Sequence, residues 1–168
     1  CVNNKNIYGA GGSNSGILGQ FSCYNKGRKY NDAHSLTELY IVNCTNIGDC
    51  STSTWNSGIV GKGIGIIEGD GDVSMTITKC INSGKIKGQE CAGIVGQGCC
   101  HCENDTFMTT LNCVISDCEN YGEIGSYTSK NGSIYALRDS LDFRPTQVNA
   151  QSGFTFNYTT SPTSTNSG

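Results

Sequence analysis

Charge, proline and histidine are all scarce in this chain of 168 residues. It has 11 lysines and arginines against 14 aspartates and glutamates, a net charge of −3, with 2 prolines and 2 histidines. Binding to nucleic-acid phosphates takes clustered basic residues, so this balance argues against a nucleic-acid partner. No apolar run is long enough to span a membrane, so no membrane span is predicted.

Motifs for catalysis and for cofactor binding are missing as well. His34 and His101 lie in no nucleophile motif, and no GxSxG, HExxH or P-loop is present. The glycine-rich stretch 61–71 lacks GxGxxG, and Met75 occupies the position where a calcium loop beginning at Asp70 needs glycine. We therefore expect neither an enzyme nor a bound cofactor.

Cysteine, in contrast, is abundant. Eleven cysteines in one short chain are typical of an oxidising compartment, where disulfides form and persist. Four N-glycosylation sequons support the same route, and they begin at Asn43, Asn104, Asn131 and Asn157. The sequence therefore predicts a glycoprotein that is secreted, extracellular or held at the cell surface.

All the cysteines are candidates for disulfides, and the sequence leaves their connectivity open, with Cys80–Cys118 among the possible pairs. They are Cys1, Cys23, Cys44, Cys50, Cys80, Cys91, Cys99, Cys100, Cys102, Cys113 and Cys118. The odd number implies a free thiol, a bond to another chain or further sequence. Cys99 and Cys102 have the spacing of zinc ligands, with His101 between them, but we expect disulfides here and no metal.

An internal repeat dominates the chain. The segments 1–9, 44–52, 80–88 and 118–126 each begin with cysteine and read CVNNKNIYG, CTNIGDCST, CINSGKIKG and CENYGEIGS. Two positions after the cysteine, all four have asparagine, namely Asn3, Asn46, Asn82 and Asn120. A second block follows, reading SGILGQ, SGIVGK and AGIVGQ, and a third block with an isoleucine precedes three of the cysteines.

Each block has the length and the residues of a β-strand. The blocks are rich in β-branched residues, are bounded by glycine or asparagine, and are too short to form a helix. Three such strands bury little alone, but stacked copies bury a continuous core. The fold class predicted is all-β, a parallel β-solenoid of about four three-stranded coils with cysteine-bearing insertions. An antiparallel sandwich is the alternative.

Stacking the coils makes three further predictions. Ile41, Ile77 and Ile115 should lie in an internal stack, and the four asparagines should form a ladder of side-chain amides. The repeated glycines should occupy corners with positive φ.

The CxNxGxIxG block followed by AGIVGQ resembles the GLUG-type and related glycine-rich β-helical repeats of secreted adhesins and cell-surface proteins. The resemblance covers roughly residues 1–134. It implies a β-helical fold with a structural or adhesive role. The insertions with cysteines and the tail after about residue 140 have no counterpart in that pattern.

The ends of the chain suggest a way to assemble. We expect a solenoid domain over 1–140 and, over 141–168, a strand followed by a Ser/Thr-rich tail. The tail strand alternates three aromatic residues, Phe154, Phe156 and Tyr158. The chain starts at a repeat cysteine without the strand that precedes the others, so we expect this tail strand to complete the first coil of another copy. The hypothesis is a head-to-tail homopolymer that forms a filament or surface fibre.

The alternative function is a secreted β-helix that binds or cleaves polysaccharide. In that case surface carbohydrate would be the partner, and Trp55, Tyr24 and Tyr121 would line a sugar groove.

Overall fold

A computed structural model gives the fold of the chain. It describes residues 1–9, 12–20, 24–25, 36–52, 54–64, 66–67, 71–89, 91–96, 101–102, 109–126, 154–160 and 165–166. None of these residues is helical, and every pairing between the strands they form is parallel. The predicted all-β class with parallel strands is therefore confirmed.

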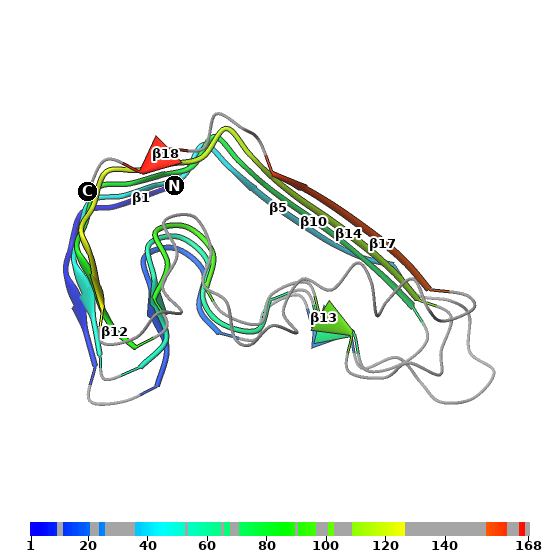
Figure 1. The fold of residues 1–168 in the computed structure, drawn as a ribbon, viewed down its shortest axis with the longest axis horizontal. Helices are drawn as coiled ribbons and strands as arrows, with labels where there is room; N and C mark the ends of the chain where they lie inside the picture. Colours follow the sequence, from blue (N-terminus) through cyan, green and yellow to red (C-terminus); the bar gives the residue numbers. More distant parts are fainter. Residues whose placement is uncertain are drawn as a thin grey trace.

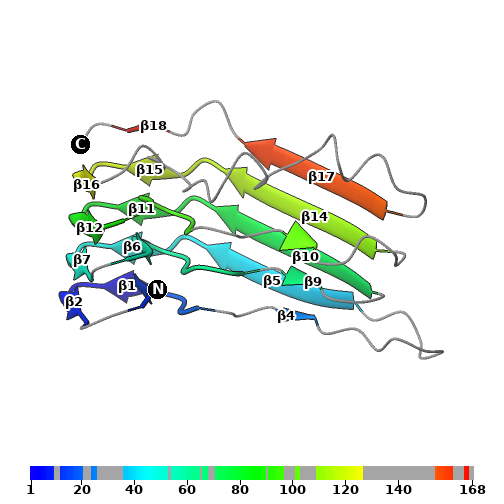
Figure 2. The ribbon, with the colours of Figure 1, turned by 60° about the horizontal axis from the view of Figure 1, so that its bottom comes forward.

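Successive parts of the chain follow the same path, one above the other, as the overlaid traces in Figure 1 show. We call each passage along this path a layer and number the layers from the N-terminus. Within layers two to four a long strand comes first, and shorter strands follow in the same order. Figure 2 shows the layers from the side, with the long strands stacked as one sheet.

Four long strands form what we call the long sheet. It has the order β17-β14-β10-β5 and comprises β5 (Leu36–Val42), β10 (Gly71–Thr78), β14 (Thr109–Ser116) and β17 (Phe154–Thr160). Next along the path is the asparagine sheet, with β1 (Val2–Asn3), β6 (Thr45–Asn46), β11 (Ile81–Asn82), β15 (Glu119–Asn120) and β18 (Thr165–Asn166).

Three smaller sheets follow along the path, formed by four, two and three of the layers in the described residues. The first contains β2 (Ile7–Tyr8), β7 (Cys50–Ser51), β12 (Ile86–Gly88) and β16 (Ile124–Ser126). The second pairs β3 (Asn14–Ser15) with β8 (Asn56–Ser57). The third contains β4 (Tyr24–Asn25), β9 (Ile66–Ile67) and β13 (His101–Cys102).

The layers are held in register by identical side chains in columns. Ile41, Ile77 and Ile115 are direct partners across the long sheet, and at most 6% of any of them is exposed. Burying an isoleucine contributes about 1.5–3 kcal/mol, and a slip of one residue would turn this column outward. The core therefore fixes the register of the stack.

The repeated glycines have a different role from the one predicted. In the described residues, positive φ falls on Asn43, Lys79 and Asp117 and on three glycines, none of which belongs to the repeated column Gly48, Gly84 and Gly122. A Cβ on Gly84 would lie 2.1 Å from the carbonyl oxygen of Gly48 in the layer below. Glycine is needed in this column because successive layers approach too closely for a side chain, and the prediction of glycine corners was wrong.

The tail strand adds a layer that the repeat search missed. β17 pairs in register with β14, and β18 pairs with β15 as β15 pairs with β11. The tail therefore lies on the stack of its own chain, where the sequence predicted a spare strand after about four coils.

Replacing Gly84 with alanine tests the close approach of the layers. The added methyl group would collide with backbone of the layer below, so we expect a loss of about 3 kcal/mol in the free energy of unfolding. The matched control is Gly19→Ala, because a Cβ there meets no atom within 4 Å. Urea unfolding of both variants measures the difference, and equal stabilities would contradict the explanation.

Candidate functional site

A ladder of asparagine side chains runs through the middle of the stack. The Asn3 Nδ2 donates to Asn46 Oδ1 at 2.7 Å, Asn46 Nδ2 to Asn82 Oδ1 at 2.8 Å, and Asn82 Nδ2 to Asn120 Oδ1 at 2.7 Å. Asn46, Asn82 and Asn120 are completely buried. β18 places Asn166 opposite Asn120 in the register of the same sheet.

Each ladder asparagine also holds its own turn. Asn46 Nδ2 donates to Gly48 O at 2.8 Å, and Asn82 and Asn120 make the same bond to the glycine two residues later. The glycines of the second block press against the ladder, since a Cβ on Gly58 would lie 2.5 Å from the Asn82 amide. The asparagine of the first block and the glycine of the second block are therefore in contact with each other in the stack.

The repeat cysteines form a second column beside the ladder. Cys44, Cys80 and Cys118 are buried and belong to the larger hydrophobic core. Their thiols donate to the carbonyl two residues earlier, Cys80 to Thr78 O at 3.3 Å and Cys118 to Ser116 O at 3.2 Å. Cys1 is exposed, and its ammonium nitrogen lies 3.6 Å from the Cys44 sulfur.

Cys50 and Cys91 occupy a smaller core with Ile86. The six cysteines whose side chains are described, Cys1, Cys44, Cys50, Cys80, Cys91 and Cys118, are thiols in the structure. Cys102 lies on β13 and Cys113 on β14, and only their backbone is described. The candidates Cys23, Cys99 and Cys100 lie outside the described residues.

A sharp corner precedes the cysteine in three layers. Asn43, Lys79 and Asp117 have φ of 53°, 54° and 51°, and all three are exposed. The sequon at Asn43 therefore sits on an outward corner between the long sheet and the asparagine sheet. Asn157 lies on β17 in register with Asn112, and the sequons at Asn104 and Asn131 lie outside the described residues.

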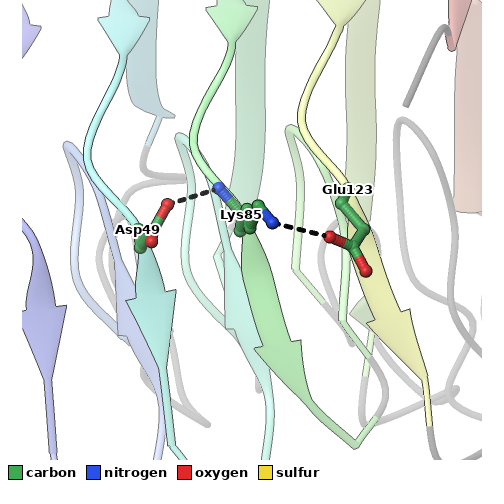
Figure 3. A network of polar contacts seen from close by, with 3 residues as sticks. All are labelled: Asp49, Lys85 and Glu123. Carbon is green, nitrogen blue, oxygen red and sulfur yellow. Dashed lines mark hydrogen bonds and ion pairs between the residues drawn. The ribbon is translucent and has the colours of Figure 1, made fainter.

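A column of alternating charge lies on the exposed side of the turn after the ladder. Figure 3 shows its three charged members, in which the backbone amide of Lys85 donates to Asp49 Oδ1 at 2.8 Å and the Lys85 ammonium lies 3.1 Å from Glu123 Oε2. Below them, the Asp49 amide donates to Asn6 Oδ1 at 2.9 Å. The exposed pair contributes little stability, but its order favours one stacking register over others.

The long sheet ends in a free edge among the described strands. β5 pairs with β10 on one side only, and β17 pairs with β14 on one side only. Tyr40 and Val42 on β5 are 61% and 43% exposed. Asn43 N donates to Thr78 O on β10, and amide directions alternate along a strand, so the amides of Tyr40 and Val42 point away from β10.

The aromatic residues of the tail strand lie in register with β14. Phe154, Phe156 and Tyr158 are opposite Thr109, Leu111 and Cys113. Cys113 is in turn opposite Met75, whose side chain is completely buried. The aromatic alternation was read from the sequence, but its place in the register follows only from the pairing with β14.

The aromatic residues of the alternative sugar groove lie on separate parts of the path. Tyr24 is on β4, Trp55 precedes β8, and Tyr121 follows β15 with its hydroxyl bonded to Glu119. The Lys62 ammonium sits 3.1 Å from the centre of the Trp55 ring and covers that face.

Residues with the spacing of metal ligands lie only partly in the region that the structure describes. It has no group of three or more histidine, cysteine or acidic side chains arranged to hold a metal ion. His101 and Cys102 contribute backbone to β13, and His34 lies outside the described residues. The described residues also include no helix of the length and hydrophobicity that crossing a membrane takes.

Comparison with protein-family models, with curated proteins and with solved structures finds no match to this chain. The features that remain to indicate a function are therefore its own geometry: buried polar columns, outward corners and free strand edges.

The fifth layer is the feature that sequence reasoning missed. Thr165 and Asn166 pair with Glu119 and Asn120, so Ser164 precedes them as Cys118 precedes its pair. The signal was Ser164-x-Asn166-x-Gly168, which keeps the asparagine and glycine of the repeat and replaces only the cysteine. A search anchored on cysteine passes over it.

Asn82→Ala tests the ladder. The change leaves Asn120 Oδ1, the Gly84 carbonyl and one bond of Asn46 without their partner in a buried setting, so we expect a loss of about 3 kcal/mol. Asn4→Ala is the control, because Asn4 is exposed in the same kind of turn. If thermal and urea unfolding gave both variants the same stability, the ladder would not be a major interaction.

The Cys50 thiol should make stability depend on alkaline pH. Burial, and then the neighbouring Asp49 and Cys91, raise its pKa from the ordinary 9.0 to about 11. Because the folded-state pKa lies above the unfolded one, this group leaves stability unchanged below pH 9 and lowers it as pH rises toward 11. Urea unfolding at stepped pH should show a shallower fall for Cys50→Ala than for the wild type, and parallel curves would contradict the assignment.

Proposed function

We propose that this chain is the subunit of an extracellular fibre, a glycosylated and disulfide-stabilised β-solenoid whose copies stack head to tail. In this proposal its main partner is a second copy of itself, it has an adhesin-like structural role, and it catalyses no reaction. The resemblance of its repeats to those of GLUG-type surface proteins points the same way.

The observation that carries the proposal is the pair of free edges of the long sheet. Every layer is parallel and in register with the next, so the upper edge of one copy has the strand direction that the lower edge of another copy needs. β17 of one copy beneath β5 of the next would place Thr159 opposite Tyr40, as Thr159 already stands opposite Val114. Such a contact repeats without closing.

Exposed apolar side chains support this choice of edge. Among the residues whose side chains the structure describes, six large apolar side chains are exposed, and five of them lie in layers one and two, namely Val2, Tyr8, Tyr40, Val42 and Ile47. An apolar surface beside an unpaired strand favours association with another sheet.

The sequon at Asn43 is compatible with this arrangement. Asn43 is exposed and follows the last residue of β5, so a glycan there would be attached outside the strand that forms the edge. Occupied sequons and export would place the fibre outside the cell, where a stack of this kind serves as a surface structure.

Tyr40→Pro tests assembly through the edge of β5. Proline removes the outward amide of residue 40 and is tolerated on an edge strand, so pairing with β10 should survive while addition of a further strand fails. Losing one backbone bond and adding a steric block should raise the concentration needed for assembly by about tenfold or more. Sedimentation and electron microscopy of the purified chain measure the effect.

The matched control is Tyr40→Thr, which keeps the amide and copies Thr76 of the next layer. Circular dichroism and a melting curve show whether the proline variant is folded. We expect the threonine variant to assemble like the wild type. A wild type that stays monomeric at high concentration, or a folded proline variant that assembles equally well, would overturn the proposal.

A further inference from the structure

Successive thiols of the cysteine column lie in adjacent layers with the same backbone pairing, Cys44 with Cys80 and Cys80 with Cys118. Cys80 and Cys118 are both completely buried, and they lie in adjacent layers. The residues on either side of them are direct partners, Thr78 with Ser116 and Ile81 with Glu119. The amide of Glu119 donates to Cys80 O at 2.9 Å, so the backbones are joined at the cysteines themselves.

The distance between layers suits a disulfide. Parallel neighbours lie about 4.8 Å apart, and Cα atoms joined by a disulfide lie about 4.4–6.8 Å apart. In-register side chains start with their Cβ atoms about 5 Å apart, which is wider than the bond needs, so one of them has to move inward. Both cysteines follow a left-handed corner, at Lys79 and Asp117, and lie outside the strands, where the backbone adjusts more readily.

The layer above determines which partner Cys118 has. β18 continues the asparagine sheet over β15, and the residue before β18 is Ser164. Cys118 therefore has a cysteine on one side only, whereas Cys80 lies between Cys44 and Cys118. A bond between Cys44 and Cys80 would leave Cys118 as a buried thiol with no partner in the column.

We propose that Cys80 and Cys118 form a disulfide between layers three and four when the chain folds with a disulfide oxidant such as oxidised glutathione. The inference concerns this column alone and does not depend on whether copies assemble. It makes the pair a modification site in which one covalent bond locks two adjacent layers together.

The chemistry balances as a thiol–disulfide exchange. The Cys118 thiolate attacks the oxidant, a mixed disulfide forms, and one glutathione thiolate leaves. The Cys80 thiol then loses its proton and its thiolate attacks the Cys118 sulfur, releasing the second glutathione. Two protein thiols are oxidised and one glutathione disulfide is reduced to two thiols.

The two thiols influence each other in the folded structure. The neighbouring Cys80 lowers the pKa of the Cys118 thiol, against the effect of burial, and Cys118 together with burial raises the pKa of Cys80. The exchange balances equally with Cys80 as the first nucleophile, so the product does not depend on the order of attack.

The experiment refolds the reduced chain in a glutathione redox buffer, alkylates the remaining thiols after denaturation and maps the peptides without reduction. We expect the peptides with Cys80 and Cys118 to be recovered as a linked pair that reductant separates. A Cys44–Cys80 link, or alkylation of both Cys80 and Cys118, would overturn the proposal.

Serine variants provide the matched controls, because serine keeps a donor for the carbonyl two residues earlier, and Ser164 precedes β18 in the sequence as Cys118 precedes β15. Cys44→Ser should leave the yield of the linked pair unchanged. Cys118→Ser should abolish this linked pair and leave Cys80 to be alkylated after denaturation or to link to Cys44, its other neighbour in the column. Loss of the Cys80–Cys118 pair in Cys44→Ser, with the variant still folded, would show that the assignment is wrong.

Discussion

The hydrogen bond from one asparagine amide to the next is the constraint on which the rest of this structure depends. An amide has donors and acceptors on opposite sides, so a buried asparagine is satisfied when an identical residue lies directly above and below it. Asn46, Asn82 and Asn120 meet this condition with no exposure to water. Any change of register would leave these groups buried and unpaired, which makes the ladder a strict selector of one stacking arrangement.

The glycines, the core and the charges agree with that arrangement. Gly58 and its equivalents allow the second block to lie against the ladder, and the isoleucine column fixes the same register from the long sheet. The exposed charged column favours the same register, because it places Lys85 between the acidic residues Asp49 and Glu123. Consistency among these columns is what makes one stacking arrangement of the layers specific.

Much of the fold could be predicted from the sequence because residues at equivalent positions of a repeat are expected to stack on one another in successive layers. Asn3, Asn46, Asn82 and Asn120 share a repeat position, and the structure gives them a common column. The fifth layer could not be found in the same way, since Ser164 stands where the other layers have cysteine. The role of Gly84 could not be predicted from the repeat either. Glycine is favoured both at a corner with positive φ and where the backbones of two layers lie very close, and only the structure distinguishes these two cases. The free edges of β5 and β17 likewise depend on which strands pair, and a repeat alone does not state this.

The left-handed corners have a consequence for what the stack can display. At Asn43, Lys79 and Asp117 the backbone has the same left-handed conformation, and all three residues are exposed. An amide, a cation and an anion therefore occupy equivalent places on three neighbouring layers. Exposed corner residues therefore recur about every 4.8 Å along the stack. The residue type at the corner can change from layer to layer without a change in the backbone of the stack.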